Sequence, residues 1–120
     1  MSPEPKTSHE QLLESIRIAL VAYAQTLLSP GNVHPGNSWI VLTPNFVAFR
    51  PQPRKKTLRV SLRGYRGEYD QRPELPLKRG RPGYSECVIE GPHQLLAAAE
   101  YIHSASGIYR RRNTPPEAAA

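Results

Sequence analysis

The amino-acid sequence predicts a single α+β domain, in which two helices pack on one face of a four-stranded antiparallel sheet in the order α-β-β-β-β-α. Three observations predict this class. Short apolar runs separated by turn residues fill the middle of the chain, an amphipathic helical pattern lies on each side of them, and the 120 residues suffice for one hydrophobic core. We expect the folded domain to span residues 7–109, between a disordered amino terminus (1–6) and a disordered basic, Pro-rich tail (110–120).

The first helix is expected to begin at Thr7 or Ser8, because each is followed three residues later by Glu or Gln in a capping box. Pro30 and Gly31 end it, and residues 29–37 then form an exposed connection. Its main apolar face consists of Leu13, Ile16, Leu20, Tyr23, Ala24 and Leu27, widened by Ala19. Four further apolar residues outside this face indicate deeper burial or a dimer contact; they are Leu12, Ile18, Val21 and Leu28.

Three strands are predicted at residues 39–42, 46–49 and 58–63, with Pro-containing turns between them. The third run alternates Leu, Val and Leu with Arg59, Ser61 and Arg63. A period of two with one charged face is typical of a half-buried sheet. The cations of this strand should therefore lie on the face away from the helices, joined by Arg50 if the register allows.

A fourth strand is predicted at residues 84–90, with Cys87 and Ile89 on one face. The second helix follows Gly91-Pro92 and ends near Gly107, so that the arginines at 110–112 form a frayed basic tail. Its predicted apolar face consists of Leu95, Leu96, Ala99, Ile102 and Ala105 or Ser106. Residues 64–83, before the fourth strand, show no strand or helix period, and a loop of this length is commonly functional or mobile.

Positive charge is concentrated in one part of the chain. The net charge is +6, and residues 50–81 hold eleven Lys or Arg against three Asp or Glu. Such a segment attracts polyanions, although basic loops are also often only solvated. The candidate nucleic-acid-binding residues are Arg54, Lys55, Lys56, Arg59, Arg63, Tyr65, Arg66, Tyr69, Lys78, Arg79 and Arg81.

Two aromatic residues of this segment have two interpretations. Tyr65 and Tyr69 could stack on unpaired bases, or their rings could pack the loop against the domain. Trp39 is likewise either a core residue or the anchor of an interface.

The potentially reactive side chains form no constellation that catalysis or metal binding requires. Glu68, Asp70, Glu74 and Lys78 loosely resemble nuclease residues, but a Gly- and Pro-rich segment would hold them poorly, and they also suit as counter-charges for neighbouring arginines. The four histidines lack the spacing of a zinc site, and Cys87 fits a buried core residue. We expect no enzyme activity, no metal and no cofactor.

A membrane partner is not expected either. The most apolar stretch, residues 16–28, contains Arg17 and Gln25 and is shorter than the roughly 20 residues a membrane span needs. The amino terminus lacks the pattern of a secretory signal, and a single cysteine fits a reducing compartment. These features predict a cytoplasmic protein.

The central strands also carry a family pattern. It consists of Trp39-Ile40, Asn45-Phe46, the Gln-Pro-Arg-Lys-Lys run at 52–56 and Leu58-Arg59-Val60-Ser61-Leu62. The pattern resembles a small bacterial domain of unknown function, labelled a predicted transport protein, found alone or at the carboxyl end of restriction-related proteins. Residues 86–102 are similar to that domain's final strand and helix. The resemblance implies an accessory module near nucleic-acid defence systems and supplies no catalytic residues.

Together these patterns predict a non-catalytic accessory module that contacts DNA or RNA through a basic strand face and loop. The alternative is a protein interaction or dimerisation module, in which the basic residues meet an acidic protein or the first helix meets a second copy.

Overall fold

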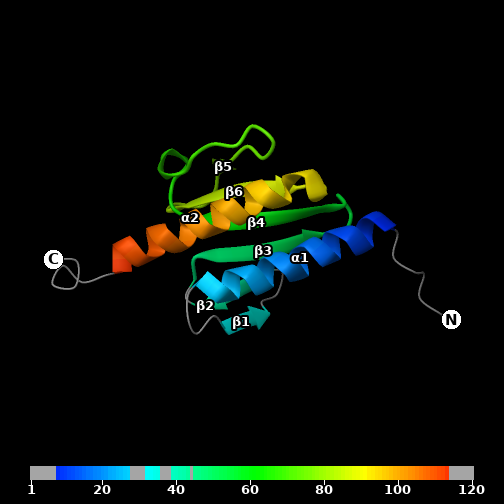
Figure 1. The fold of residues 1–120 in the computed structure, drawn as a ribbon, viewed down its shortest axis with the longest axis horizontal. Helices are drawn as coiled ribbons and strands as arrows, with labels where there is room; N and C mark the ends of the chain where they lie inside the picture. The colour runs from blue at the N-terminus through cyan, green and yellow to red at the C-terminus, as the bar shows by residue number, and fades with distance from the viewer. Residues whose placement is uncertain (1–7, 28–31, 36–38, 44, 114–120) are drawn as a thin grey trace.

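The computed structural model describes residues 8–27, 32–35, 39–43 and 45–113 and consists of one antiparallel sheet with two helices on one of its faces (Figure 1). The chain order is α1 (Ser8–Leu27), six strands, and α2 (Leu95–Asn113). The α+β class and the antiparallel sheet are thus confirmed, whereas the prediction of four strands is wrong. The expected disorder of residues 1–6, the end of the tail at 114–120 and the role of Leu28 lie outside the described residues.

The six strands pair in the order β1-β2-β3-β4-β6-β5. Four of them correspond to the predicted strands, namely β2 (Ile40–Thr43), β3 (Val47–Gln52), β4 (Thr57–Arg63) and β6 (Tyr84–Ile89). Two edge strands were not predicted: β1 (Asn32–Pro35) beside β2, and β5 (Lys78–Arg79) beside β6. Both lack the apolar alternation that marks a strand, since β1 has Val33 as its one aliphatic residue besides a terminal Pro, and β5 has only two charged residues.

The core lies between the sheet and the helices. In β4, Leu58, Val60 and Leu62 are buried, and Phe49 of β3 and Cys87 of β6 flank Val60 in register on the same face. Side chains of a strand alternate between the faces, so the intervening residues of β4 point away from the helices. The predicted period of two is confirmed for Cys87 and Ile89 of β6 and for β4 apart from Ser61, which is buried although it lies on the other face.

Helix α1 buries Leu13, Ile16, Leu20, Val21 and Ala24, which confirms most of the predicted face. Val21 is an additional core residue, whereas Ala19 is exposed and does not widen the stripe.

Helix α2 differs more from its prediction. It is preceded by a 3-10 turn (Pro92–Gln94) and continues past Gly107 to Asn113, so Arg110, Arg111 and Arg112 belong to the helix and not to a frayed tail. Leu96 is 66% exposed, and Tyr101 lies at the centre of the buried face instead. The two helices run in the same direction in Figure 1, and the Arg110 guanidinium donates to the Leu27 carbonyl at the end of α1.

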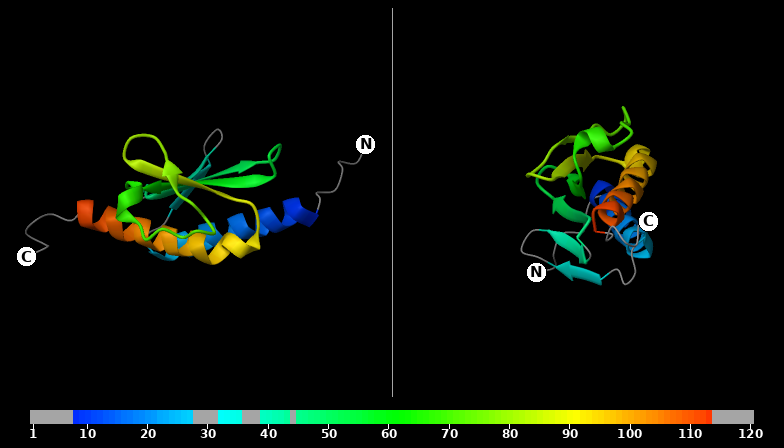
Figure 2. Two further views of the ribbon diagram at one scale, coloured as in Figure 1. Left: turned by 90° about the horizontal axis from the view of Figure 1, so that it is seen from above. Right: turned by 90° about the vertical axis from the view of Figure 1, so that its left-hand side faces the viewer.

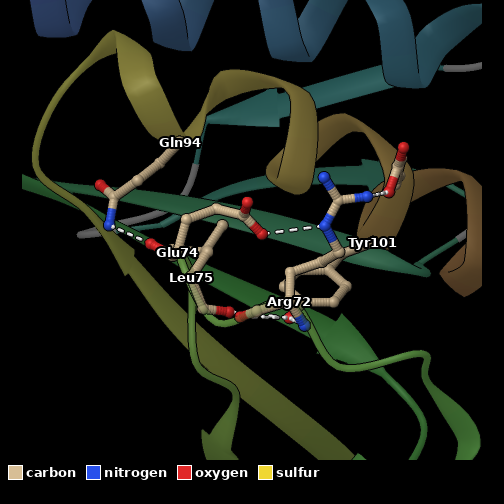
Figure 3. Close-up of polar contacts among 6 residues, drawn as sticks. Arg72, Glu74, Leu75, Gln94 and Tyr101 are labelled. Carbon is tan, nitrogen blue, oxygen red and sulfur yellow. Dashed lines mark hydrogen bonds and ion pairs between the residues drawn. The ribbon is translucent and has the colours of Figure 1, made fainter.

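The segment between β4 and β5 has more structure than its composition predicts. It contains a 3-10 turn (Arg66–Glu68) and an isolated bridge between Arg72 and Leu75. The Tyr101 hydroxyl of α2 accepts from the Arg72 amide and donates to the Leu75 carbonyl, both at 2.8 Å (Figure 3). The Gln94 amide donates to the Glu74 carbonyl at 2.9 Å, so α2 and its preceding turn hold this segment at several points.

Among the described residues, neither helix is both long and apolar enough to cross a membrane.

Candidate nucleic-acid interface

The face of the sheet turned away from the helices carries the predicted strand cations. Figure 2 shows both helices on one side of the sheet, and no described helix covers the other side. We call this other side the open face, defined by Trp39, Arg50, Arg59, Arg63, Tyr84 and Glu86. Arg59 and Arg63 lie there because they alternate with the buried Leu58, Val60 and Leu62 of β4.

Two guanidinium groups of the open face meet at one indole ring. The register pairs Arg50 of β3 with Arg59 of β4, and the β2–β3 pairing places Trp39 beside Arg50. The guanidinium carbons of Arg50 and Arg59 lie 5.9 and 5.6 Å from the centroid of the Trp39 ring, within range of a cation–π interaction. Like charges directly opposite each other in a sheet are destabilising, so this pair requires compensation.

The compensation is unequal. Arg59 is ion-paired with Glu86 of β6, with Nε 2.9 Å from the carboxylate oxygen. Arg50, among the described residues, has the Trp39 ring as a partner and no carboxylate within ion-pair distance. Among the described residues, a carboxylate thus neutralises Arg59 and none neutralises Arg50.

A second aromatic cluster lies at the other end of β4. The Arg63 guanidinium donates to the Tyr84 hydroxyl at 2.8 Å, and its central carbon lies 5.4 Å from the Tyr84 ring and 6.0 Å from the Tyr109 ring. Arg81, which is exposed, lies 4.1 Å from the Tyr84 centroid. Tyr84 thus carries two arginines, as Trp39 does.

The remaining predicted cations lie near the two ends of β4. Arg54, Lys55 and Lys56 are exposed in the β3–β4 turn at one end, and Arg66, Lys78, Arg79 and Arg81 are exposed in the segments that follow β4 or precede β6. Lys78 pairs in register with Glu86 of the open face. Arg79 pairs with the buried Ser85, so its side chain leaves the sheet on the opposite face. Apart from Arg79, the cations of the open face, with Arg50, and those at the two ends of β4 form a band along this strand, which is about 23 Å long at 3.3 Å per residue, and not one compact patch.

The two tyrosines of the loop differ in accessibility. Tyr69 is 6% exposed and packs edge-on against Tyr101, with ring centroids 5.8 Å apart, and its hydroxyl donates to the Arg63 carbonyl. Burial raises the pKa of Tyr69 well above its ordinary value. Tyr69 therefore packs the loop against the domain, and its ring is not presented to a ligand. Tyr65 is 57% exposed, with the Arg112 guanidinium 5.8 Å from its ring.

Four residues of this surface are not among the residues predicted to bind: Trp39, Arg50, Tyr84 and Arg112. For two of them the sequence contains a signal. Alternation within residues 84–90 puts Tyr84 on the face opposite Cys87 and Ile89, and the register of its strand puts Arg50 beside Arg59. Arg112 was missed because the helix was expected to end near Gly107.

The acidic residues of the loop have structural partners. Glu68 accepts from Arg112 at 2.7 Å and from the Tyr65 amide at 2.6 Å. Glu74 pairs with Arg72 at 2.8 Å, and this hydrogen bond lowers the pKa of Glu74. Among the described residues, no group of three or more His, Cys, Asp or Glu is arranged to hold a metal ion. Cys87 is buried, which raises the pKa of its thiol to about 12.

Comparisons with protein-family models, curated proteins and solved structures find no match to this chain. The resemblance of residues 39–62 to the bacterial domain therefore stays a prediction.

Proposed function

We propose that this chain is a non-catalytic accessory module that binds nucleic acid through its open face and the basic segments at both ends of β4. The observation that carries the proposal is the pair Arg50 and Arg59, opposed across adjacent strands over Trp39. Glu86 neutralises one of these charges, and the other has no carboxylate partner among the described residues. A phosphate bound here would relieve the repulsion between the two guanidinium groups.

The distribution of the other cations supports a polyanion over a single anion. Exposed Lys and Arg lie at both ends of the band along β4, so successive phosphates of one strand could contact it. The resemblance to a bacterial domain associated with restriction-related proteins agrees with this role. As part of the same proposal, the protein is bacterial and acts in the cytoplasm.

The test is binding of labelled DNA and RNA at about 50 and about 200 mM salt, the range over which phosphate contacts lose much of their affinity. The variant Arg50→Ser/Lys55→Ser removes two cations of the band. The matched control, Arg17→Ser/Arg111→Ser, removes two cations from the helices. Both variants have the same net charge.

The band variant should bind more weakly, and its log–log salt slope should fall by about 0.7 to 0.9 for each lost phosphate contact. The control should match the wild type. Absence of binding at low salt refutes the proposal, and equal losses in both variants would show that net charge, not the open face, attracts the nucleic acid.

One observation favours a second candidate, a dimerisation module. Nine exposed residues of α1 are uncharged, although 22% of the chain is charged, and Ile18 among them is 54% exposed. These exposed residues are Ser8, Gln11, Leu12, Ser15, Ile18, Ala19, Ala22, Gln25 and Thr26. The charged side chains of Glu14, 40% exposed, and Arg17 form an ion pair beside them. An uncharged face suits an isologous contact with a second copy of this chain.

Sedimentation equilibrium tests this candidate. The wild type should associate as its concentration rises, and Ile18→Glu should abolish association while leaving the melting temperature of the monomer unchanged. A monomeric wild type at all concentrations excludes it.

A further inference from the structure

We infer that the open face binds unpaired bases and not a duplex, with Trp39 and Tyr84 as the surfaces on which bases stack. This inference rests on the proposed function and adds the class of nucleic acid. Proteins that bind single strands combine cationic grooves with aromatic rings and arginine planes, because every base has a π-face to stack on.

The first stacking surface is the Trp39 ring. It is half-buried at the start of β2, and it meets the guanidinium groups of Arg50 and Arg59, each half-exposed. Both cations lie over the ring at 5.6 to 5.9 Å from its centroid, so a base that stacks on Trp39 displaces a guanidinium group from the ring and leaves that charge beside the phosphate. The ring and the Arg50 guanidinium, which has no carboxylate partner in the part of the chain that the structure describes, therefore form one subsite.

The second stacking surface is the Tyr84 ring. Arg81 lies 4.1 Å from its centroid, and Arg63 anchors the Tyr84 hydroxyl at 2.8 Å, which fixes the ring at the end of β4. This subsite repeats the chemistry of the first, with the exposed Arg81 over one face of the Tyr84 ring, where a base replaces the guanidinium group or stacks on its plane.

The sheet register gives the spacing of the two rings. Trp39 shares a row with Arg50 and Arg59, and Tyr84 shares a row with Arg63, four residues further along β4. Four residues and three strand spacings correspond to about 13 and about 14 Å, or about 20 Å diagonally. That distance exceeds one base and fits several nucleotides of an extended strand.

The row between the two rings consists of Val41, Ala48, Ser61 and Glu86. Ala48 and Ser61 are small and largely covered by their neighbours, 7% and 6% exposed, and the Glu86 carboxylate is held by Arg59. A duplex is a poor fit, since the major groove, about 12 Å wide, admits a helix or a two-stranded ribbon and not a sheet of this width. Splayed bases of a single strand can lie flat on such a face.

Trp39 is the single tryptophan of the chain, so its fluorescence reports directly on the first subsite. The experiment titrates the wild type with a thymidine oligomer of about 12 nucleotides, a duplex of the same length, and an abasic oligomer of the same length and charge. The first should quench Trp39 and bind about tenfold or more tightly than the abasic oligomer, and the duplex should leave the fluorescence unchanged.

Variants separate stacking from charge. Trp39→Leu and Tyr84→Leu should each weaken binding of the thymidine oligomer about tenfold without changing binding of the abasic one, whereas Trp39→Phe should retain most of the affinity. The anisotropy of fluorescently labelled oligomers measures binding of all variants, because the Trp39 variants contain no tryptophan. Circular dichroism verifies that each variant folds, and the conservative Phe variant keeps the test valid if a Leu variant does not.

The outcomes distinguish the two proposals. Equal binding of all three ligands with no quenching overturns this inference and leaves nucleic-acid binding in place. Binding of none of them at low salt overturns both.

Discussion

Replacing Tyr101 by Phe removes one oxygen atom and tests what holds the segment between β4 and β5. The hydroxyl lies at 2.8 Å from both the Arg72 amide and the Leu75 carbonyl, and Tyr101 is 1% exposed (Figure 3). An unsatisfied buried polar group costs about 1 to 3 kcal/mol. The hydrogen bond from the Arg72 amide is partly buried and the one to the Leu75 carbonyl is fully buried, so loss of the second dominates, and we expect a loss of about 2 kcal/mol in the free energy of unfolding.

Urea unfolding followed by Trp39 fluorescence measures this loss, and hydrogen exchange of the Arg72 amide shows whether the segment opens locally. Each kcal/mol corresponds to about 4 to 8 °C in melting temperature for a domain of this size class. Tyr23→Phe is the matched control, because the Tyr23 hydroxyl has no hydrogen-bond partner among the described residues. If Tyr101→Phe changes stability by less than about 0.5 kcal/mol and leaves exchange at Arg72 unchanged, the hydroxyl does not hold the segment.

Four further predictions concern stability and reactivity. Gly64→Ala should destabilise by more than about 1 kcal/mol, because Gly64 has φ of +107° and an added Cβ would lie 2.9 Å from the Glu68 carboxylate, whereas Gly67→Ala, with open space around it, should be neutral in the same urea titration. Cys87 should react with a thiol reagent only as fast as the chain unfolds, and a fast native-state reaction would contradict its burial. Burial raises the pKa of Cys87 from 9.0 to about 12, so the folded state holds a proton that the unfolded state releases, and stability should fall as pH rises from about 9 to about 12, less so in Cys87→Ala. Arg72 lowers the pKa of Glu74 in the folded state. The ionised Glu74 therefore contributes to the free energy of unfolding above the ordinary Glu pKa, and this contribution is lost as pH falls through the lower folded pKa. In a pH series of urea midpoints, Arg72→Gln should reduce this loss of stability at acid pH.

The parts of the fold that could be predicted from the sequence are those whose signal is local. The alternation around Val60 and the turn residues on both sides of it define β3 and β4 without reference to any partner. Strand β1 has no such signal, because Val33 becomes part of a strand only by pairing opposite Leu42. The short β5 depends in the same way on β6.

Helix α2 shows a different limit of prediction from sequence, the choice of its buried face. Its small and apolar residues allow more than one buried face, and an aliphatic stripe through Leu96 is as regular as the actual one. The choice is made by Tyr101, whose hydroxyl meets the loop segment 72–75, a contact between distant parts of the chain. Periodicity alone does not contain that information.

The residues of the candidate site also differ in whether a local pattern or a long-range contact determines their position. Arg59 and Arg63 were placed on the outer face by alternation, and the structure agrees. The meeting of Arg63 with Tyr84 depends on β6 pairing directly with β4 while β5 lies outside, a topology that no local pattern predicts. The interpretation of Tyr69 as a stacking residue failed for a related reason, since its ring packs on Tyr101 of α2.

The outermost strand, β5, has a consequence for how this protein behaves at high concentration. Backbone groups at a sheet edge can pair with another chain, and natural proteins limit this with short edge strands and charged side chains. At this edge the strand has two residues, Lys78 and Arg79, both exposed and both positive. Replacing them with Val or Thr would favour aggregation through edge pairing, so variants made to remove their charge should use Ser or Gln, which keep the edge polar.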